Sequence, residues 1–158
     1  MNKIKALIKN KKIFIIEDCA EALGAEYKGG KVGLIGDVGC FSFFANKVIT
    51  TGEGGMVLTK DTNLLEKMAL YRDHGMSKDR RYWHVAPGFN YRMTNLQAAV
   101  GVAQLERIDF FLDHRAQMVK SYNNFLEKIP GINTPFTAAW AKNIHWLYSI
   151  TIEPKKLG

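Results

Sequence analysis

The chain has 158 residues, of which 47% are hydrophobic and 23% are charged, and its formal net charge at pH 7 is +7. This length and composition fit one folded domain and exclude collagen-like and intrinsically disordered chains. The positive charge attracts phosphate groups, but no interleaved aromatic residues of a nucleic-acid recognition motif accompany it. We therefore expect an anionic small molecule as the partner, and no nucleic acid.

Membrane segments, disulfides and metal sites are not predicted. No apolar run approaches the roughly 20 residues needed to cross a bilayer, and lysines interrupt the N-terminal region where a signal peptide would be apolar. Cys19 and Cys40 form no CxxC pair and lie in apolar surroundings typical of buried free thiols. The four histidines lack metal-ligand spacing. These features predict a cytoplasmic protein without a metal.

In chain order, the first predicted element is an amphipathic helix over residues 3–10. Residues 13–16 are apolar at four consecutive positions, which is typical of a strand buried on both faces of a parallel sheet. Two carboxylates, Glu17 and Asp18, follow at the carboxyl end of that strand. In open α/β sheets, ligands bind at this edge.

A second strand is predicted over residues 38–44, and Lys47 follows it in a loop. The glycine-rich turn of residues 52–55 then leads into a third apolar segment, residues 56–59. We expect the two strands that flank the turn to be neighbours in the sheet.

The second half of the chain is predicted to be mainly helical. A helix spans about residues 61–74, and the aromatic and basic segment 76–93 is typical of a functional loop. Helical patterns cover residues 94–128 and end before Pro130. Residues 145–152 are predicted to form a strand.

Lys47 is the residue that most needs a chemical explanation. A lysine that attacks a carbonyl carbon needs surroundings that desolvate it, because desolvation lowers the amine pKa and leaves a neutral nucleophile. Phe43, Phe44, Val48 and Ile49 can supply apolar walls. The alternative is an exposed loop lysine beside a turn.

Asp18 and Ser42 also allow two interpretations each. Asp18 can cap a helix, and Ser42 can contact neighbouring backbone. However, a carboxylate and a lysine at the strand ends of one sheet are the groups that pyridoxal phosphate chemistry requires, one for the ring nitrogen and one for the aldehyde carbon. The Ser42 hydroxyl can bind the phosphate.

Several segments in a fixed order resemble the DegT/DnrJ/EryC1/StrS family of sugar aminotransferases, which are fold-type I pyridoxal phosphate enzymes. The similarity covers about residues 5–150, and the matching segments are Ile15–Ala25, Phe41–Phe43 with Lys47, Thr50–Gly55, Gly88–Asn95, Gln97–Ala99 and Gln104–Leu105. The resemblance implies an α/β fold with a mostly parallel sheet and flanking helices. Residues 1–130 would belong to the large cofactor-binding domain, and residues 131–158 would begin the small C-terminal domain.

The resemblance also implies a role for each site residue. Lys47 would bind the aldehyde carbon of the cofactor and then move protons between substrate and cofactor. Asp18 would pair with the ring nitrogen and Ser42 would hold the phosphate. Asn90 would reach the phosphate of the cofactor in the other subunit of a homodimer. Glu21 occupies a position where many members have a glutamine against the cofactor ring.

The implied reaction is amino transfer, because relatives that dehydrate have histidine in place of the lysine at position 47. The segments Tyr82–His84 and Gly88–Asn95 look like the perosamine synthase branch, which aminates C4 of GDP-4-keto-6-deoxymannose with glutamate. The expected function is therefore transfer of an amino group from glutamate to a nucleotide-linked 4-keto-6-deoxy sugar for polysaccharide synthesis.

Family members are more than twice as long as this chain, so the resemblance implies a truncated middle portion of an enzyme. We expect such a portion to bind pyridoxal phosphate weakly or not at all, and to fold marginally, because its sheet edges and apolar faces would be exposed. The alternative function is an inactive fragment that dimerises with a full-length relative.

Overall fold

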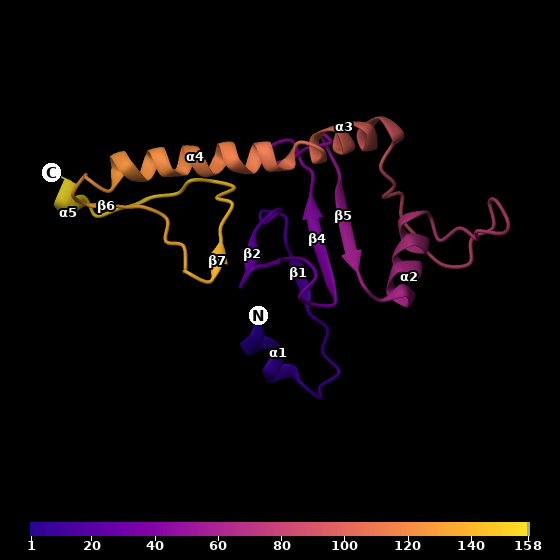
Figure 1. Cartoon of the computed structure of the whole chain (residues 1–158). Coiled ribbons are helices and arrows are strands. Elements are labelled where there is room, and N and C mark those ends of the chain that lie inside the picture. Colours follow the sequence, from indigo (N-terminus) through magenta and orange to yellow (C-terminus); the bar gives the residue numbers. More distant parts are fainter. Residues whose placement is uncertain (158) are drawn as a thin grey trace.

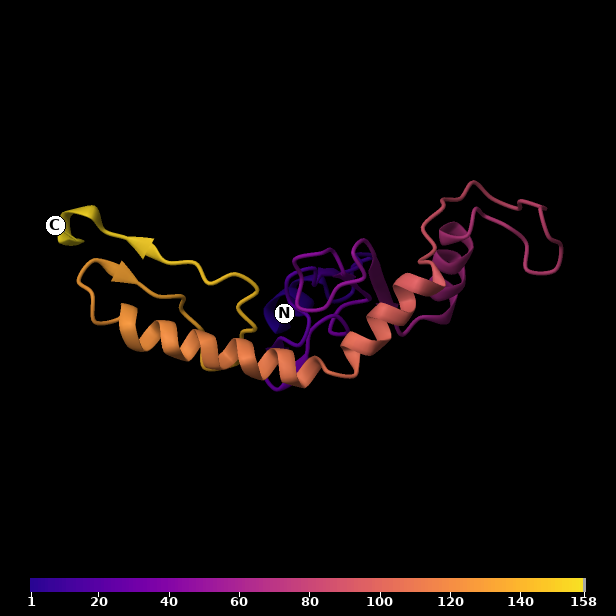
Figure 2. The ribbon, with the colours of Figure 1, turned by 90° about the horizontal axis from the view of Figure 1, so that it is seen from above.

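The computed structural model describes residues 1–157 and shows an elongated molecule (Figures 1 and 2). Helices α3 (Asn95–Leu105) and α4 (Ile108–Leu126) follow one another along its length. A small sheet lies below them in the middle of the molecule (Figure 1). Gly158, the last residue of the predicted second domain, lies outside the described residues.

The central sheet contains β1 (Ile16–Asp18), β4 (Val38–Ser42) and β5 (Gly55–Thr59), in the order β1-β4-β5. β1 and β4 are parallel, whereas β4 and β5 are antiparallel. The predicted neighbourhood of the strands flanking the turn is therefore confirmed, and the fold is α/β with a mixed sheet. Since β1 and β4 are parallel, their carboxyl ends meet at the same edge.

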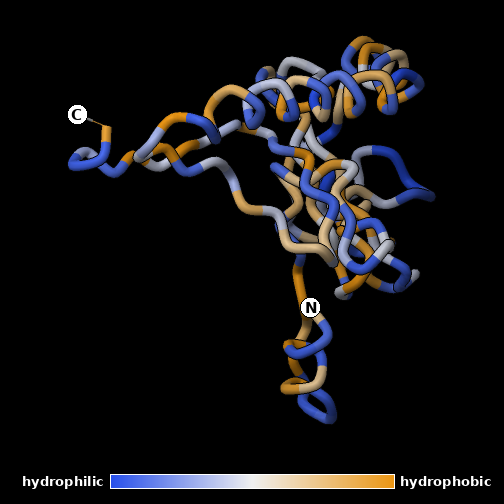
Figure 3. The backbone as a smooth tube through the Cα atoms, turned by 60° about the vertical axis from the view of Figure 1, so that its left-hand side comes forward, coloured by the Kyte–Doolittle hydropathy of each residue, from blue (hydrophilic) through white to orange (hydrophobic). Residues whose placement is uncertain are grey.

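The strand predicted over residues 13–16 is wrong in position and in burial. β1 begins at Ile16, and Phe14 and Ile16 are 74% and 68% exposed. The reason is that β1 is an edge strand, paired only with β4 among the described residues. Residues 13–15, just before it, are an apolar stretch between α1 (Asn2–Ile8) and the sheet (Figure 3).

Helix α1 (Asn2–Ile8) lies apart from the sheet (Figure 1) and has no buried residue. Two hydrogen bonds link it to the rest of the chain: the Asn2 N–H donates to the Tyr27 hydroxyl at 3.4 Å, and the Lys5 amine donates to the carbonyl oxygen of Ile35 at 3.0 Å. The predicted apolar face exists, but Leu7 on it is 72% exposed. Amphipathic spacing therefore predicted the helix and not a packing partner for it.

Helix α2 (Thr62–Arg72) follows β5 and begins where the Asp61 carboxylate accepts the backbone N–H groups of Asn63 and Leu64. It ends two residues before the predicted boundary at residue 74. The Gly75 N–H closes the last turn by donating to the Leu70 carbonyl oxygen at 2.9 Å.

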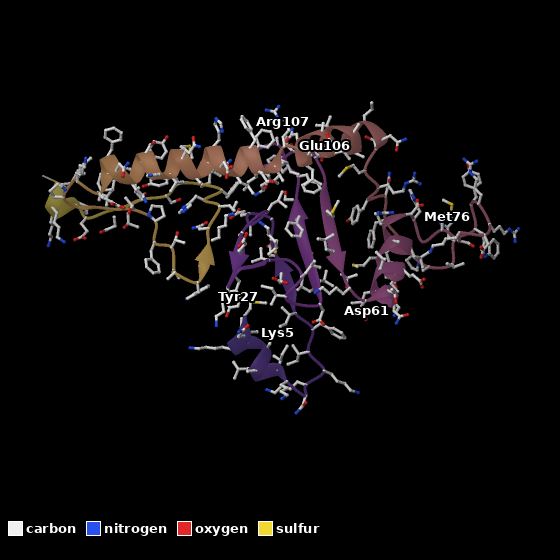
Figure 4. All side chains as sticks on the ribbon, in the orientation of Figure 1. Lys5, Tyr27, Asp61, Met76, Glu106 and Arg107 are labelled. Carbon is white, nitrogen blue, oxygen red and sulfur yellow. The ribbon has the colours of Figure 1, made fainter. Side chains whose placement is uncertain are left out.

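The break between the two long helices lies at Glu106 and Arg107 (Figure 4). Thr94 begins α3 with a reciprocal cap, in which its hydroxyl accepts the Gln97 N–H and the Gln97 side chain accepts the Thr94 N–H. α4 ends at Leu126, slightly before the predicted end. Among residues 1–157, no helix has both the length and the apolar character needed to span a bilayer.

The C-terminal part folds back onto the first half of the chain. Its elements are β6 (Ile132–Asn133), β7 (Ala141–Lys142), β8 (Thr151–Ile152) and α5 (Pro154–Leu157). β6 pairs with β8, and β7 joins two early strands, β2 (Glu26–Tyr27) and β3 (Gly30–Lys31), in a small antiparallel sheet of order β3-β2-β7. The pairing of β7 with β2 ties residues beyond 130 to the region beside β1.

The strand predicted over residues 145–152 is wrong except for Thr151–Ile152. Side chains hold the backbone before it instead of a strand partner. Asn143 accepts the His145 N–H at 2.8 Å, and Arg115 donates to the carbonyl oxygens of His145 and Trp146. His145 also has a positive φ of 45°, which interrupts an extended chain.

The buried apolar core among the described residues is small and lies in two places. Three of its members surround the end of the central sheet and two lie where α4 meets the C-terminal part: Cys19, Phe43, Ile49, Val119 and Ile144. The larger of these clusters lies beside the predicted lysine loop.

Candidate active site

The shared carboxyl edge of β1 and β4 brings together three of the predicted site residues. Asp18 ends β1 and lies in register with Cys40 of β4. Ser42 ends β4 two residues later, and Lys47 follows in the connecting loop. This edge is where the strand polarity of α/β sheets places ligand sites.

Glu17 and Asp18 have different roles because successive side chains in a strand point to opposite faces. Glu17 is buried, and its carboxylate accepts the backbone N–H groups of Gly33, Ile35 and Gly36 at 2.7 to 3.0 Å. Asp18 is exposed, and one of its oxygens accepts the Ala20 N–H at 3.0 Å. Glu17 therefore stabilises the fold, and Asp18 remains available to a ligand.

The Lys47 side chain is only 12% exposed, so it is not an ordinary solvated loop lysine. Its amine lies 3.8 Å from the centroid of the Trp146 ring and 3.6 Å from a carboxylate oxygen of Glu21. Of the predicted apolar walls, Phe43 is buried, whereas Phe44 is 43% exposed. The indole of Trp146 forms the wall in direct contact with the amine.

Helix α3 holds the loop that carries Lys47. The Gln104 side chain accepts the Thr50 N–H at 2.8 Å, and the Gln97 side-chain amide donates to the Glu53 carbonyl oxygen at 3.1 Å. Within the loop, the Thr50 hydroxyl donates to the Phe43 carbonyl oxygen. Gln97 and Gln104 both lie in segments that carry the family resemblance in the sequence. In the structure, both side chains hold the lysine loop against α3.

Ser42 keeps a donor for a ligand. Its oxygen accepts the Phe44 N–H at 3.2 Å, which is the local backbone contact considered as the alternative. Within residues 1–157, the hydroxyl donates no hydrogen bond. A serine hydroxyl both accepts and donates, so the local contact leaves its proton free.

Asn90 does not join this group in the chain. It forms a bridge with Asp73 just beyond the end of α2, and it is exposed. This region lies beyond β5, on the far side of the sheet from β1 (Figure 1). Its expected contact across a dimer interface therefore stays a prediction.

Trp146 is the site residue that sequence reasoning missed. Its indole N–H donates to the carbonyl oxygen of Asn46 at 3.0 Å, across a separation of 100 residues. No local pattern around Trp146 signals this contact, because the contact depends on how α4 returns the chain to the sheet.

The thiol of Cys19 lies next to Asp18 in sequence and is buried. Burial, followed by the charges of Glu17 and Asp18 and by Cys40, raises the pKa of this thiol to about 11. The thiol is therefore protonated near neutral pH. No group of three or more histidine, cysteine or acidic residues with metal-binding geometry occurs in the described chain.

Comparisons with known proteins agree with these features. The profile of the DegT/DnrJ/EryC1/StrS aminotransferase family matches residues 1–157. The GDP-perosamine synthase of Caulobacter vibrioides is 46% identical over 153 residues, which are 96% of this chain and 41% of that protein. The GDP-perosamine synthase of Escherichia coli is 42% identical over 150 residues, which are 95% of this chain and 41% of that protein.

Among solved structures, PseC of Helicobacter pylori, an aminotransferase involved in the biosynthesis of pseudoaminic acid, matches with a TM-score of 0.90 and 33% identity. The match covers 98% of this chain and 42% of that one. The chain thus spans about two fifths of the length of these relatives. By the profile match over nearly its whole length, the chain belongs to the DegT/DnrJ/EryC1/StrS aminotransferase family.

Proposed function

We propose that the chain carries the lysine-bearing part of a pyridoxal phosphate-dependent aminotransferase site. The enzyme moves an amino group from glutamate to a nucleotide-linked 4-keto-6-deoxy sugar of the perosamine type. The observation that carries this proposal is the shielded Lys47 amine at the sheet edge where the Asp18 carboxylate is exposed. The identity to GDP-perosamine synthases supports the choice of sugar.

The chemical groups at this edge fit the cofactor. Asp18 has a carboxylate for the ring nitrogen, Ser42 has a hydroxyl proton for the phosphate, and Lys47 has an amine for the aldehyde carbon. When bound, pyridoxal phosphate supplies an electron sink that lets an amino group and a proton leave a carbon atom.

Three residues of the chain would bind or move protons, or stabilise charge, at the cofactor. The Asp18 carboxylate would accept the ring N–H and favour its protonated form. The Lys47 amine would hold the aldehyde carbon and, once displaced by the amino donor, would take the proton from the carbon that bears the amino group. Glu21, at 3.6 Å, would stabilise the ammonium group that this proton transfer produces.

Glutamate is the amino donor, the product serves polysaccharide synthesis, and the enzyme works in the cytoplasm as a homodimer. In that dimer, Asn90 extends from one subunit to the cofactor phosphate of the other. The exposed position of Asn90 beyond β5 supports this assignment.

A cofactor titration of the full chain tests the proposal. On addition of pyridoxal phosphate, we expect a visible absorption band that reaches its full height only at high cofactor concentration, because binding is weak. Lys47→Ala should abolish the band. Lys31→Ala, which removes an exposed lysine, should leave it unchanged. Glutamate should then change the band, and a GDP-linked 4-keto sugar should reverse the change better than a UDP-linked one. A band that persists in Lys47→Ala would overturn the assignment.

A second candidate function is a non-catalytic chain that associates with a full-length relative. Large apolar side chains that are more than 70% exposed favour it, namely Leu7, Phe14, Tyr82, Tyr91, Leu96, Phe125 and Phe136. If this alone were the function, the chain would co-elute with a full-length GDP-perosamine synthase and show no Lys47-dependent band.

A further inference from the structure

Two contacts connect Trp146 with the lysine loop. The Lys47 amine lies 3.8 Å from the centroid of the indole ring, and the indole N–H donates to the Asn46 carbonyl oxygen at 3.0 Å. An aromatic face attracts a cationic amine, and this attraction is stronger when the pair is shielded from water. The small exposure of the Lys47 side chain meets that condition.

The backbone at Trp146 is held by α4. Arg115 of α4 donates to the carbonyl oxygens of His145 and Trp146, at 3.2 and 2.8 Å. Ile144, two residues before Trp146, is only 6% exposed and anchors the same segment in the core. The indole therefore reaches the loop from a backbone that the Arg115 hydrogen bonds and the buried Ile144 side chain both hold in place.

Glu21 is a weaker restraint on the amine than Trp146. The Glu21 side chain is 59% exposed, and its oxygen lies 3.6 Å from the amine, which is beyond hydrogen-bond distance. Exposed ion pairs contribute little, because water screens them and both side chains lose freedom. The indole is the more rigid and better shielded of the two partners.

We propose that Trp146 is a positioning residue for Lys47. Its ring face holds the amine at the sheet edge, and its N–H fixes the loop through the carbonyl of Asn46. This inference rests on the proposed function, in which the same amine binds the aldehyde carbon. Removal of the indole would let the lysine side chain rotate, so the amine would be easier to reach and less often held at the sheet edge.

Two measurements on the full chain test this role. The first is the rate at which cyanate modifies Lys47 without cofactor, read by peptide mass spectrometry. The second is the fraction of Lys47 that borohydride fixes to added pyridoxal phosphate. The variants are Trp146→Leu and Trp146→Phe, and the matched control is Trp140→Leu, whose indole packs edge-on against Tyr27 instead. Far-UV circular dichroism shows whether each variant is folded.

We expect Trp146→Leu to raise the cyanate rate at Lys47 roughly three- to tenfold, the factor that an aromatic–cation contact of this kind represents. The fraction of Lys47 fixed to the cofactor should fall at the same time. Trp146→Phe, which keeps a ring face and loses the N–H, should lie between, and Trp140→Leu should match the unchanged chain. A faster cyanate reaction together with less cofactor fixed at Lys47 distinguishes a residue that positions the amine from one that only covers it.

The role would be overturned if both readouts rose together, because Trp146 would then only shield the amine, or if neither changed. If Trp146→Leu does not fold, Trp146→Phe decides by the same opposed changes. Cofactor fixed without preference for Lys47 in the unchanged chain would refute the proposed function and the positioning role together. Fixation at Lys47 that is insensitive to both Trp146 variants would refute the positioning role alone.

Discussion

At the scale of single residues, the structure separates two neighbouring carboxylates that the sequence presents as a pair. Glu17 accepts three backbone N–H groups of residues 33–36 and is buried, whereas Asp18 faces outward at the sheet edge. Strand alternation explains the difference, and it could have been applied to the sequence. The sequence could not show which of the two carboxylates faces inward, because that depends on where the loop of residues 33–36 folds.

Replacing Glu17 by glutamine should destabilise the chain by about 2–3 kcal/mol, since the charge-assisted bonds weaken and an amide N–H₂ group meets backbone donors. Urea unfolding measures this cost. The control is Glu66→Gln on the exposed face of α2, which should change the unfolding free energy little. Equal effects of the two substitutions would contradict a buried structural role for Glu17.

The Cys19 thiol should resist thiol reagents at pH 8 in the folded chain. Its pKa is raised from 9.0 to about 11, first by burial, so about one molecule in a thousand carries the thiolate at that pH. The same shift makes stability independent of this group below pH 9 and lowers stability as the pH rises from 9 toward 11. Titration with a disulfide reagent before and after unfolding measures how far the fold protects the thiol from labelling. In Cys19→Ala, the loss of stability between pH 9 and 11 should become smaller. Rapid labelling of Cys19 in the folded chain would refute this account.

At the scale of elements, local patterns predicted what depends on neighbours in sequence. Such patterns predicted that the strands on either side of the glycine-rich turn are neighbours, and that helices occur in the regions of α1 to α4. The strands expected over residues 13–16 and 145–152 were wrong, because edge pairing in the first case and Arg115 in the second decide the backbone. The contact of Trp146 with the Lys47 loop was beyond any local pattern.

Helix α3 is expected to stabilise the lysine loop through Gln104. Gln104→Leu leaves the half-buried Thr50 N–H without its acceptor and should cost about 1–3 kcal/mol of stability. Hydrogen exchange at Thr50 should become faster, and Gln117→Leu on the exposed side of α4 serves as the control. Unchanged exchange at Thr50 would show that the loop does not depend on α3.

At the scale of the whole molecule, the chain is an elongated arrangement with a small core and several exposed apolar side chains. The domain boundary near residue 130 stays a prediction, and the pairing of β7 with β2 links the residues on its two sides. The site lies at this link, since β1, β4 and the segment of Trp146 all contribute to it. Because the core is small, we predict that the chain alone binds the cofactor weakly.

The most direct test of the central claim is to map where pyridoxal phosphate attaches. The full chain is incubated with excess cofactor and reduced with borohydride, and the modified lysines are identified by peptide mass spectrometry. The account predicts modification mainly at Lys47, although its side chain is only 12% exposed and many other lysines are exposed. It also predicts loss of this preference in Asp18→Asn. Modification spread over the exposed lysines, with Lys47 among the least modified, would contradict the claim that Lys47 is the cofactor-binding lysine.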